Sequence, residues 1–203
     1  MPRRAAFLAC VLALCVPATA RANGDPASDY LLVQSVFLPF NAKVDKGAAE
    51  RLNETIKAAD EAGFRIKVAV IGTRYDLGTA FSLYNQAQRY AQFLGLELSF
   101  QYHDRLLVVM PKGYGYSIDG KNDARGIRVV KRFPSPGTDA TMQVEAATQA
   151  IRKLAADSGH ALPEPKSGRG GSQTRDRITI AAGVTALVAL LAGIVLFRRS
   201  RTI

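Results

Sequence analysis

The chain has 203 residues, 48% of them apolar and 22% charged, which indicates one or two globular domains rather than a disordered segment. Its net charge of +10 comes largely from six arginines that flank apolar runs at the two ends: Arg3, Arg4, Arg21, Arg198, Arg199 and Arg201. Without these six, 21 Lys and Arg residues face 17 Asp and Glu residues, a net charge of +4 over residues 23–197, so the composition disfavours a nucleic-acid-binding protein, a disulfide scaffold and a cytosolic enzyme.

Residues 1–22 have the pattern of a secretory signal peptide. The apolar run Ala5–Val16 has 12 residues, too few to cross a bilayer core of ~30 Å as a helix. Small residues then offer cleavage sites, and we expect cleavage after Ala22. An uncleaved anchor and a lipid-modified Cys15 are the alternatives. Because Cys10 and Cys15 both lie in this segment, the mature chain would hold no disulfide and no Cys-ligated metal.

Strand and helix patterns alternate through the middle of the chain. Apolar, β-branched stretches predict strands over residues 30–37, 66–72, 96–102 and 105–110. Helical spacing predicts helices over residues 46–62, 79–94 and 140–156, with Asp45 and Asp139 as N-caps of the first and third. The last two strands are joined so closely at His103-Asp104 that we expect a hairpin there. The alternation predicts an α/β fold, a small sandwich with a mixed, mainly parallel sheet flanked by helices.

Beyond residue 157 the composition changes twice. Prolines, glycines and a serine predict a flexible linker over residues 158–177. The 20 uncharged residues 178–197 would form a single transmembrane helix of about 30 Å, and the basic tail 198–203 would remain cytoplasmic. We therefore expect residues 23–157 to form one extracytoplasmic domain. Small residues on one face of the span predict packing against another helix, either a second copy or a partner: Ala182, Ala186, Ala189 and Gly193.

Two predicted loops follow the strands 66–72 and 105–110. In open α/β sheets, ligands bind beyond the carboxyl ends of parallel strands, so we expect a crevice between these loops. Its candidate ligand-binding residues are Arg74, Tyr75, Asp76, Lys112, Tyr114 and Tyr116. The cationic side chains would hold an anion, and the tyrosines would stack or donate hydrogen bonds. The alternative is that Asp76 caps the next helix or turn and that the tyrosines are surface residues.

Metal ligands in the mature chain would have to be carboxylates, which favour Ca²⁺ or Mg²⁺. The candidates are Asp25, Asp29, Asp76 and Asp104. Their spacing is not diagnostic, and capping or solvated carboxylates are the alternative. With only His103 and His160, and no Gly-x-Ser-x-Gly motif, a zinc site and a serine hydrolase are disfavoured. The sequence names no cofactor.

A basic cluster lies ahead of the third predicted helix. It comprises Lys121, Arg125, Arg128, Lys131 and Arg132, with Asp119 and Asp123 among them. Such a cluster favours contact with anionic lipid or with an acidic polymer of the envelope. A solvated loop is the alternative.

Three stretches resemble a known family in their order and apolar runs: Ala62–Ile71, Tyr90–Gly95 and Arg105–Gly115. Over residues 29–155 the chain resembles the TPM domain of membrane-anchored extracytoplasmic bacterial proteins and thylakoid-lumen photosystem II repair proteins. The resemblance implies either a role in membrane-complex assembly or a metal-dependent phosphatase. The family's acidic stretch near the first strand is incomplete here. We therefore expect a non-enzymatic binding, assembly or regulatory protein of the cell envelope, with the phosphatase as the alternative.

Overall fold

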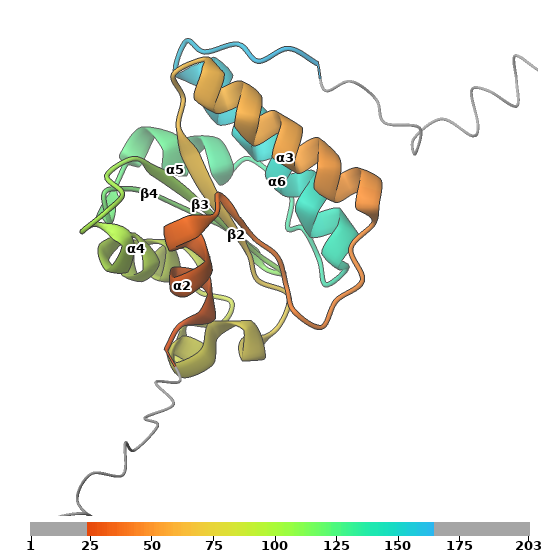
Figure 1. Ribbon diagram of the computed structural model, residues 1–203, viewed down its shortest axis with the longest axis vertical. Helices are drawn as coiled ribbons and strands as arrows, with labels where there is room; N and C mark the ends of the chain where they lie inside the picture. The colour runs from red at the N-terminus through yellow and green to blue at the C-terminus, as the bar shows by residue number, and fades with distance from the viewer. Residues whose placement is uncertain (1–23, 165–203) are drawn as a thin grey trace, which may run out of the picture.

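In the computed structural model, which describes residues 24–164, five strands form one sheet in chain order (Figure 1). They are β1 (Val36–Phe37), β2 (Ile66–Val70), β3 (Arg105–Met110), β4 (Gly113–Ile118) and β5 (Lys121–Asn122). The first three strands run parallel, whereas β4 and β5 are each antiparallel to the strand before. The prediction of an α/β fold with a mixed sheet flanked by helices is confirmed, and the sheet is parallel at its start.

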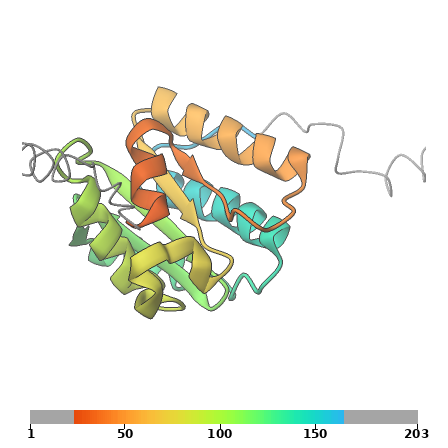
Figure 2. The same ribbon diagram turned by 60° about the horizontal axis from the view of Figure 1, so that its bottom comes forward.

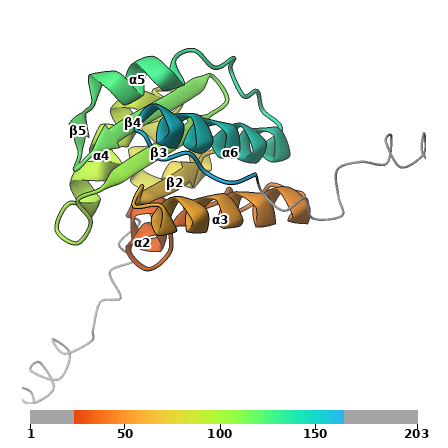
Figure 3. The same ribbon diagram turned by 90° about the horizontal axis from the view of Figure 1, so that it is seen from above.

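Helices cover both faces of this sheet (Figures 2 and 3). One face carries α3 (Lys46–Glu61), α5 (Ala124–Val130) and α6 (Ala140–Asp157), and the other carries α2 (Pro26–Val33), the 3₁₀ helix η1 (Arg74–Leu83) and α4 (Ala87–Leu98). Each group of helices packs its apolar side chains on the strands. We call the two resulting apolar clusters the α6 cluster, which includes Leu52, Val68 and Ile151, and the α4 cluster, which includes Leu31, Ile71 and Leu94.

The elements with strong local signals form where the sequence predicts them. Asp45 Oδ1 accepts the Ala48 N–H at 2.9 Å at the start of α3, and Asp139 Oδ1 accepts the Met142 N–H at 2.8 Å at the start of α6. Gly63, with φ 79°, follows α3 in the left-handed conformation that glycine tolerates best. The strand predicted over 105–110 matches β3.

The predicted strand over 30–37 is wrong for most of its length. Helix α2 occupies it as far as Val33 and leaves only Val36–Phe37 as β1. The signals for this helix lie upstream, where the Asp25 carboxylate accepts the Ala27 N–H at 3.1 Å and Pro26 occupies the first helical turn. An apolar run of this length fits either state, and the N-cap decides for the helix.

The predictions between residues 79 and 113 also need correction. The predicted helix 79–94 is divided: η1 ends at Leu83, and α4 begins at Ala87. Helix α4 then passes Gly95 and ends at Leu98, so the strand predicted over 96–102 does not form. Glycine is needed at position 95 because α4 packs closely on the β4–β5 turn there, where a Cβ would lie 2.8 Å from the Gly120 Cα. The hairpin therefore joins β3 to β4 rather than forming at residues 103–104.

The packed domain reaches residue 164 instead of ending at 157. His160 Nδ1 lies 2.7 Å from the Ala62 carbonyl oxygen, Leu162 packs on the α6 cluster, and Arg152 donates to the Pro163 carbonyl oxygen at 2.6 Å. These contacts fix the first part of the predicted linker along α6. The predicted signal peptide, the span 178–197 with its four packing residues, and the tail 198–203 lie outside the described residues. Between residues 24 and 164, none of the helices combines the length and the apolar character that crossing a bilayer requires.

Candidate functional site

Asp76 lies beyond the carboxyl end of β2, in the segment that follows the strand. It is 1% exposed and lies in the first turn of η1. One carboxylate oxygen accepts the Gly72 N–H at 3.1 Å, the Thr73 N–H at 2.7 Å and the Thr73 hydroxyl at 3.1 Å. The other oxygen accepts the Phe40 N–H at 3.3 Å. Both oxygens therefore accept hydrogen bonds within the fold, and the bonds from Gly72 and Thr73 are those that the alternative interpretation of Asp76 as a cap expects.

The three predicted ligand residues of the second loop, Lys112, Tyr114 and Tyr116, are not brought to Asp76. Lys112 is exposed in the β3–β4 turn. Tyr114 and Tyr116 lie in β4 and pack on the α6 cluster, whereas Leu77 of η1 belongs to the α4 cluster on the opposite face of the sheet. The expected crevice does not form because the stretch after residue 112 continues the sheet as β4 instead of forming a loop.

Arg74 and Tyr75 are exposed at the start of η1. They line a shallow hollow of about 510 Å³ together with Gly24, Pro26, Gly78, Thr79 and Phe81. Neither Lys112 nor the tyrosines of β4 contribute to this hollow. It offers mainly glycine backbone and aromatic edges, with Arg74 as its cation.

The four aspartates predicted as metal ligands are spread over the fold. Asp25 and Asp29 belong to the start of α2, Asp76 is used as described above, and Asp104 lies near the other end of β2, 3.7 Å from Arg65. Among residues 24–164, no three His, Cys, Asp or Glu side chains are grouped closely enough to hold a metal ion.

Asp25 forms a buried pair with a residue that the sequence analysis missed. It is 3% exposed, and the Tyr90 hydroxyl lies 2.8 and 2.7 Å from its two carboxylate oxygens. Burial raises the pKa of Asp25 to about 6; the hydrogen bonds from Tyr90 and the Ala27 N–H oppose this rise, and the charges of Glu97 and Asp29 add to it. Burial also raises the pKa of Tyr90. Since 65 residues separate the pair, no local sequence signal could reveal it.

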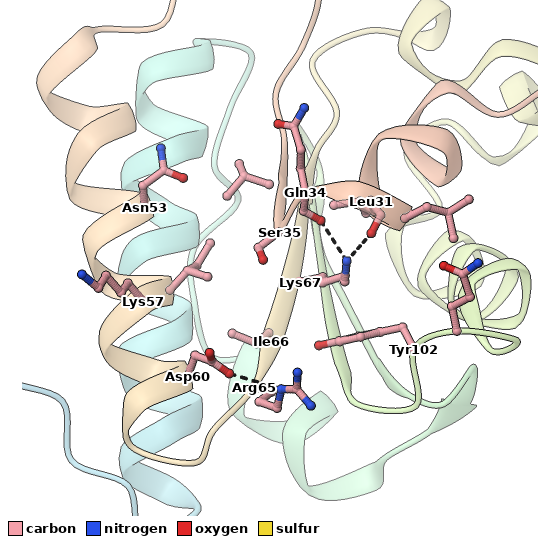
Figure 4. Close-up of a pocket in the computed structure, with 14 residues that line it drawn as sticks. Leu31, Gln34, Ser35, Asn53, Lys57, Asp60, Arg65, Ile66, Lys67 and Tyr102 are labelled. Atoms are coloured by element: carbon pink, nitrogen blue, oxygen red, sulfur yellow. Dashed lines mark hydrogen bonds and ion pairs between the residues drawn. The ribbon is translucent and has the colours of Figure 1, made fainter.

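An open groove of about 600 Å³ lies at the amino end of β2 (Figure 4). Helix α3 forms one wall with Asn53, Ile56, Lys57 and Asp60. The end of α2 and the turn after α4 form the other wall with Leu31, Leu32, Gln34, Gln101 and Tyr102. The floor between them consists of Ser35, Val36, Arg65, Ile66 and Lys67.

The groove exists because the edge strand is short. β1 pairs with β2 only at Val68 and Ala69, whereas β3 pairs with all five residues of β2. Ile66 and Lys67 therefore have no strand beside them on this edge of the sheet. The space that a longer β1 would fill remains open between α2 and α3.

Lys67 is the central polar group of the groove. Its ammonium donates to the Leu31 carbonyl oxygen and, at 2.9 Å, to the Gln34 carbonyl oxygen, both at the end of α2. It also lies 5.0 Å from the centroid of the Tyr102 ring. Burial lowers the pKa of Lys67, and the charge of Arg65 lowers it further. An ammonium carries three N–H donors, so one remains for a ligand.

The other charges of the groove are balanced. Arg65 lies 3.2 Å from Asp60 and 3.7 Å from Asp104, and Lys57 lies 3.9 Å from Glu61. A strongly anionic ligand would therefore compete with carboxylates already in place. The lining instead suits a neutral, polar ligand that uses side-chain amides and hydroxyls.

No protein-family model, curated protein or solved structure matches this chain. The interpretation of the groove therefore depends on its own chemistry. The sequence held one signal for it, a lysine inside the otherwise apolar strand Ile66–Val70.

Proposed function

We propose that this chain is a membrane-anchored, extracytoplasmic binding protein of the cell envelope, and that it holds an extended segment of a partner protein in the groove at the amino end of β2. The groove is the observation that carries the proposal. The sequence patterns of a signal peptide and a 20-residue apolar run support the location. The resemblance to TPM domains, some of which serve in membrane-complex assembly, supports the role.

The lining of the groove suits a peptide segment. Leu32, Val36 and Ile56 supply apolar contact, and Asn53 and Gln101 supply amide donors and acceptors from opposite walls. Peptide backbone needs both kinds of contact, because its carbonyl and N–H groups lose water on binding. Lys67 also lines the groove, and its remaining N–H donor would bind a backbone carbonyl oxygen.

Site-specific photo-crosslinking tests the proposal. A photoreactive side chain replaces Asn53, which lines the groove, or the adjacent exposed Glu54, which does not. After irradiation of intact cells, we expect one major protein adduct from position 53 and at least fivefold less of it from position 54. Equal adducts from both positions, or none from either, would remove the support for a groove-bound partner.

Two further measurements test the remaining parts of the proposal. Protease added to spheroplasts should digest the domain, and full protection would overturn the extracytoplasmic location. Purified protein should not hydrolyse a generic phosphomonoester with Mg²⁺ or Ca²⁺ above the rate of a protein-free control. Robust metal-dependent turnover would instead establish the phosphatase alternative.

A further inference from the structure

Three helices form one layer over a face of the sheet, and the chain leaves the domain on this layer. Helix α6 lies between α3 and α5 (Figure 3). Arg152 of α6 donates to the carbonyl oxygens of Leu162 and Pro163 and lies 2.7 Å from Glu164. These contacts hold the last described residues on the layer, so whatever follows residue 164 departs from there.

The flank of this layer formed by α5 is basic. We call the exposed cations Lys121, Arg125, Arg128, Lys131 and Arg132 the α5 surface. Two of them are paired, Arg125 with Asp157 at 2.9 Å and Lys121 with Asp119 at 3.5 Å. Within residues 24–164, the other three have no carboxylate within salt-bridge distance. Asp123 accepts the Gly126 N–H at 2.7 Å, so its carboxylate caps the start of α5 and is not paired with these cations.

The opposite flank has a different charge pattern. Helix α3 exposes Glu50, Glu54 and Glu61 along with Lys46 and Lys57. An anionic surface would thus be attracted to the α5 flank and not to the α3 flank. The layer is therefore basic on the α5 side of α6 and of mixed charge on the α3 side.

We propose that the α5 surface docks the domain on anionic lipid headgroups of the bilayer in which the chain is anchored. The proposal rests on the membrane anchor of the proposed function. Thirteen residues, 165–177, connect the domain to the apolar run and can span at most about 45 Å. So short a tether keeps the domain near the headgroups at an effective concentration on the order of millimolar. Each cation at an anionic surface then favours the docked state by roughly fivefold.

Docking in this way would leave the groove accessible. The α5 helix packs against β4, near the β5 edge of the sheet, whereas the groove lies at the β1 edge. With the α5 surface against lipid, the groove lies at the opposite edge of the sheet from the docked surface. Lipid and partner protein would therefore not compete.

Energy transfer in nanodiscs tests the docking. The full membrane-inserted chain carries a dye on Ser135→Cys, an exposed position just after α5, and the discs carry an acceptor on a lipid headgroup. We expect at least twofold higher transfer in discs with 30% phosphatidylglycerol than in phosphatidylcholine discs. Raising the salt to about 1 M, where the Debye length is about 3 Å, should remove the difference.

Two matched triple variants locate the effect. Charge reversal at Arg128, Lys131 and Arg132 to Glu should abolish the lipid-dependent increase. The same reversal at Lys43, Lys46 and Lys57, exposed residues before and within α3, should preserve it. An equal increase in both variants, or no increase in the unmodified chain, would overturn the docking. Failure of the chain to remain in discs of either lipid would instead contradict the membrane anchor.

Discussion

The two ends of strand β2 use charged residues in opposite ways. At the carboxyl end, Asp76 is buried and its two oxygens accept four hydrogen bonds from the protein. At the amino end, Lys67 is half-buried, donates to two carbonyl oxygens and lines an open groove. Asp76 therefore stabilises the fold, whereas Lys67 lines an open groove and has one N–H donor left that a ligand would use.

This difference qualifies a familiar rule about α/β sheets. Ligands usually bind beyond the carboxyl ends of parallel strands because loops there present unpaired polar groups. Here Asp76 already accepts the N–H groups of the loop after β2. The chain after β3 forms only a tight turn into β4. The open, polar-lined space lies at the other end, where β1 is too short to cover Ile66 and Lys67 of β2.

The largest expected effect comes from removing Asp76. Asp76→Ala leaves three N–H groups and the Thr73 hydroxyl without their acceptor in a partly buried turn, which should lower the free energy of unfolding by roughly 3 kcal/mol. Urea denaturation of residues 24–164, which contain both apolar clusters, measures this loss.

A matched control for Asp76→Ala is the exposed N-cap of α6. Asp139 accepts one backbone N–H, from Met142, so Asp139→Ala should cost only about 1 kcal/mol. Similar losses in the two variants would contradict the view that Asp76 completes the fold at this end of β2.

An intermediate effect, with a pH dependence, is expected from Tyr90→Phe. Asp25 has a pKa of about 6 in the folded domain against an ordinary value of 3.8, so folding binds the proton more tightly. Its contribution to stability is greatest below about pH 4 and falls by about 3 kcal/mol as the pH rises through 6. Loss of the hydroxyl removes hydrogen bonds to the ionised carboxylate and should cost roughly 2 kcal/mol at pH 7.5, but only about 1 kcal/mol at pH 4.

Urea titrations at the two pH values measure the Tyr90→Phe effect, and Asp25→Asn is the control. The pKa of Glu97 is also raised by burial, so the intact domain has a second source of pH dependence. In the Asp25→Asn background, Tyr90→Phe should cost the same at both pH values. A difference that persisted there would assign the titration to another group.

The parts of the fold that the sequence predicts correctly carry their signals locally. Helices α3 and α6 each have an aspartate cap and a regular apolar face, and β3 is a continuous apolar run. Residues 30–37 are not predicted correctly because their apolar run carries no decisive local signal and fits either a helix or a strand. The decision is made by Asp25, outside the run, and by Lys67, which binds the end of α2 from 36 residues away.

The candidate site was less predictable for a related reason. Lys67 is visible in the sequence as a lysine in an apolar strand, but its surroundings come from three distant segments, α2, α3 and the turn after α4. That a groove remains between them depends on β1 being two residues long, which is itself a consequence of α2. Residue types near strand ends could not reveal this.

The smallest expected loss of stability, and the sharpest test of the comparison, is that of Lys67→Met. The variant removes two hydrogen bonds from the end of α2 but also removes an ammonium whose pKa is lowered by burial, so the loss of the bonds is partly offset. Water in the groove can solvate the freed carbonyl oxygens. We expect a loss below about 1 kcal/mol at pH 7.

The methionine keeps an aliphatic side chain of similar length but no donor, so the partner adduct formed from position 53 should fall at least threefold. Urea midpoints and crosslinking yields measure the two effects on the same variant. A loss as large as that of Asp76→Ala, or an undiminished adduct, would mean that Lys67 only completes the fold and that the two ends of β2 do not differ in kind.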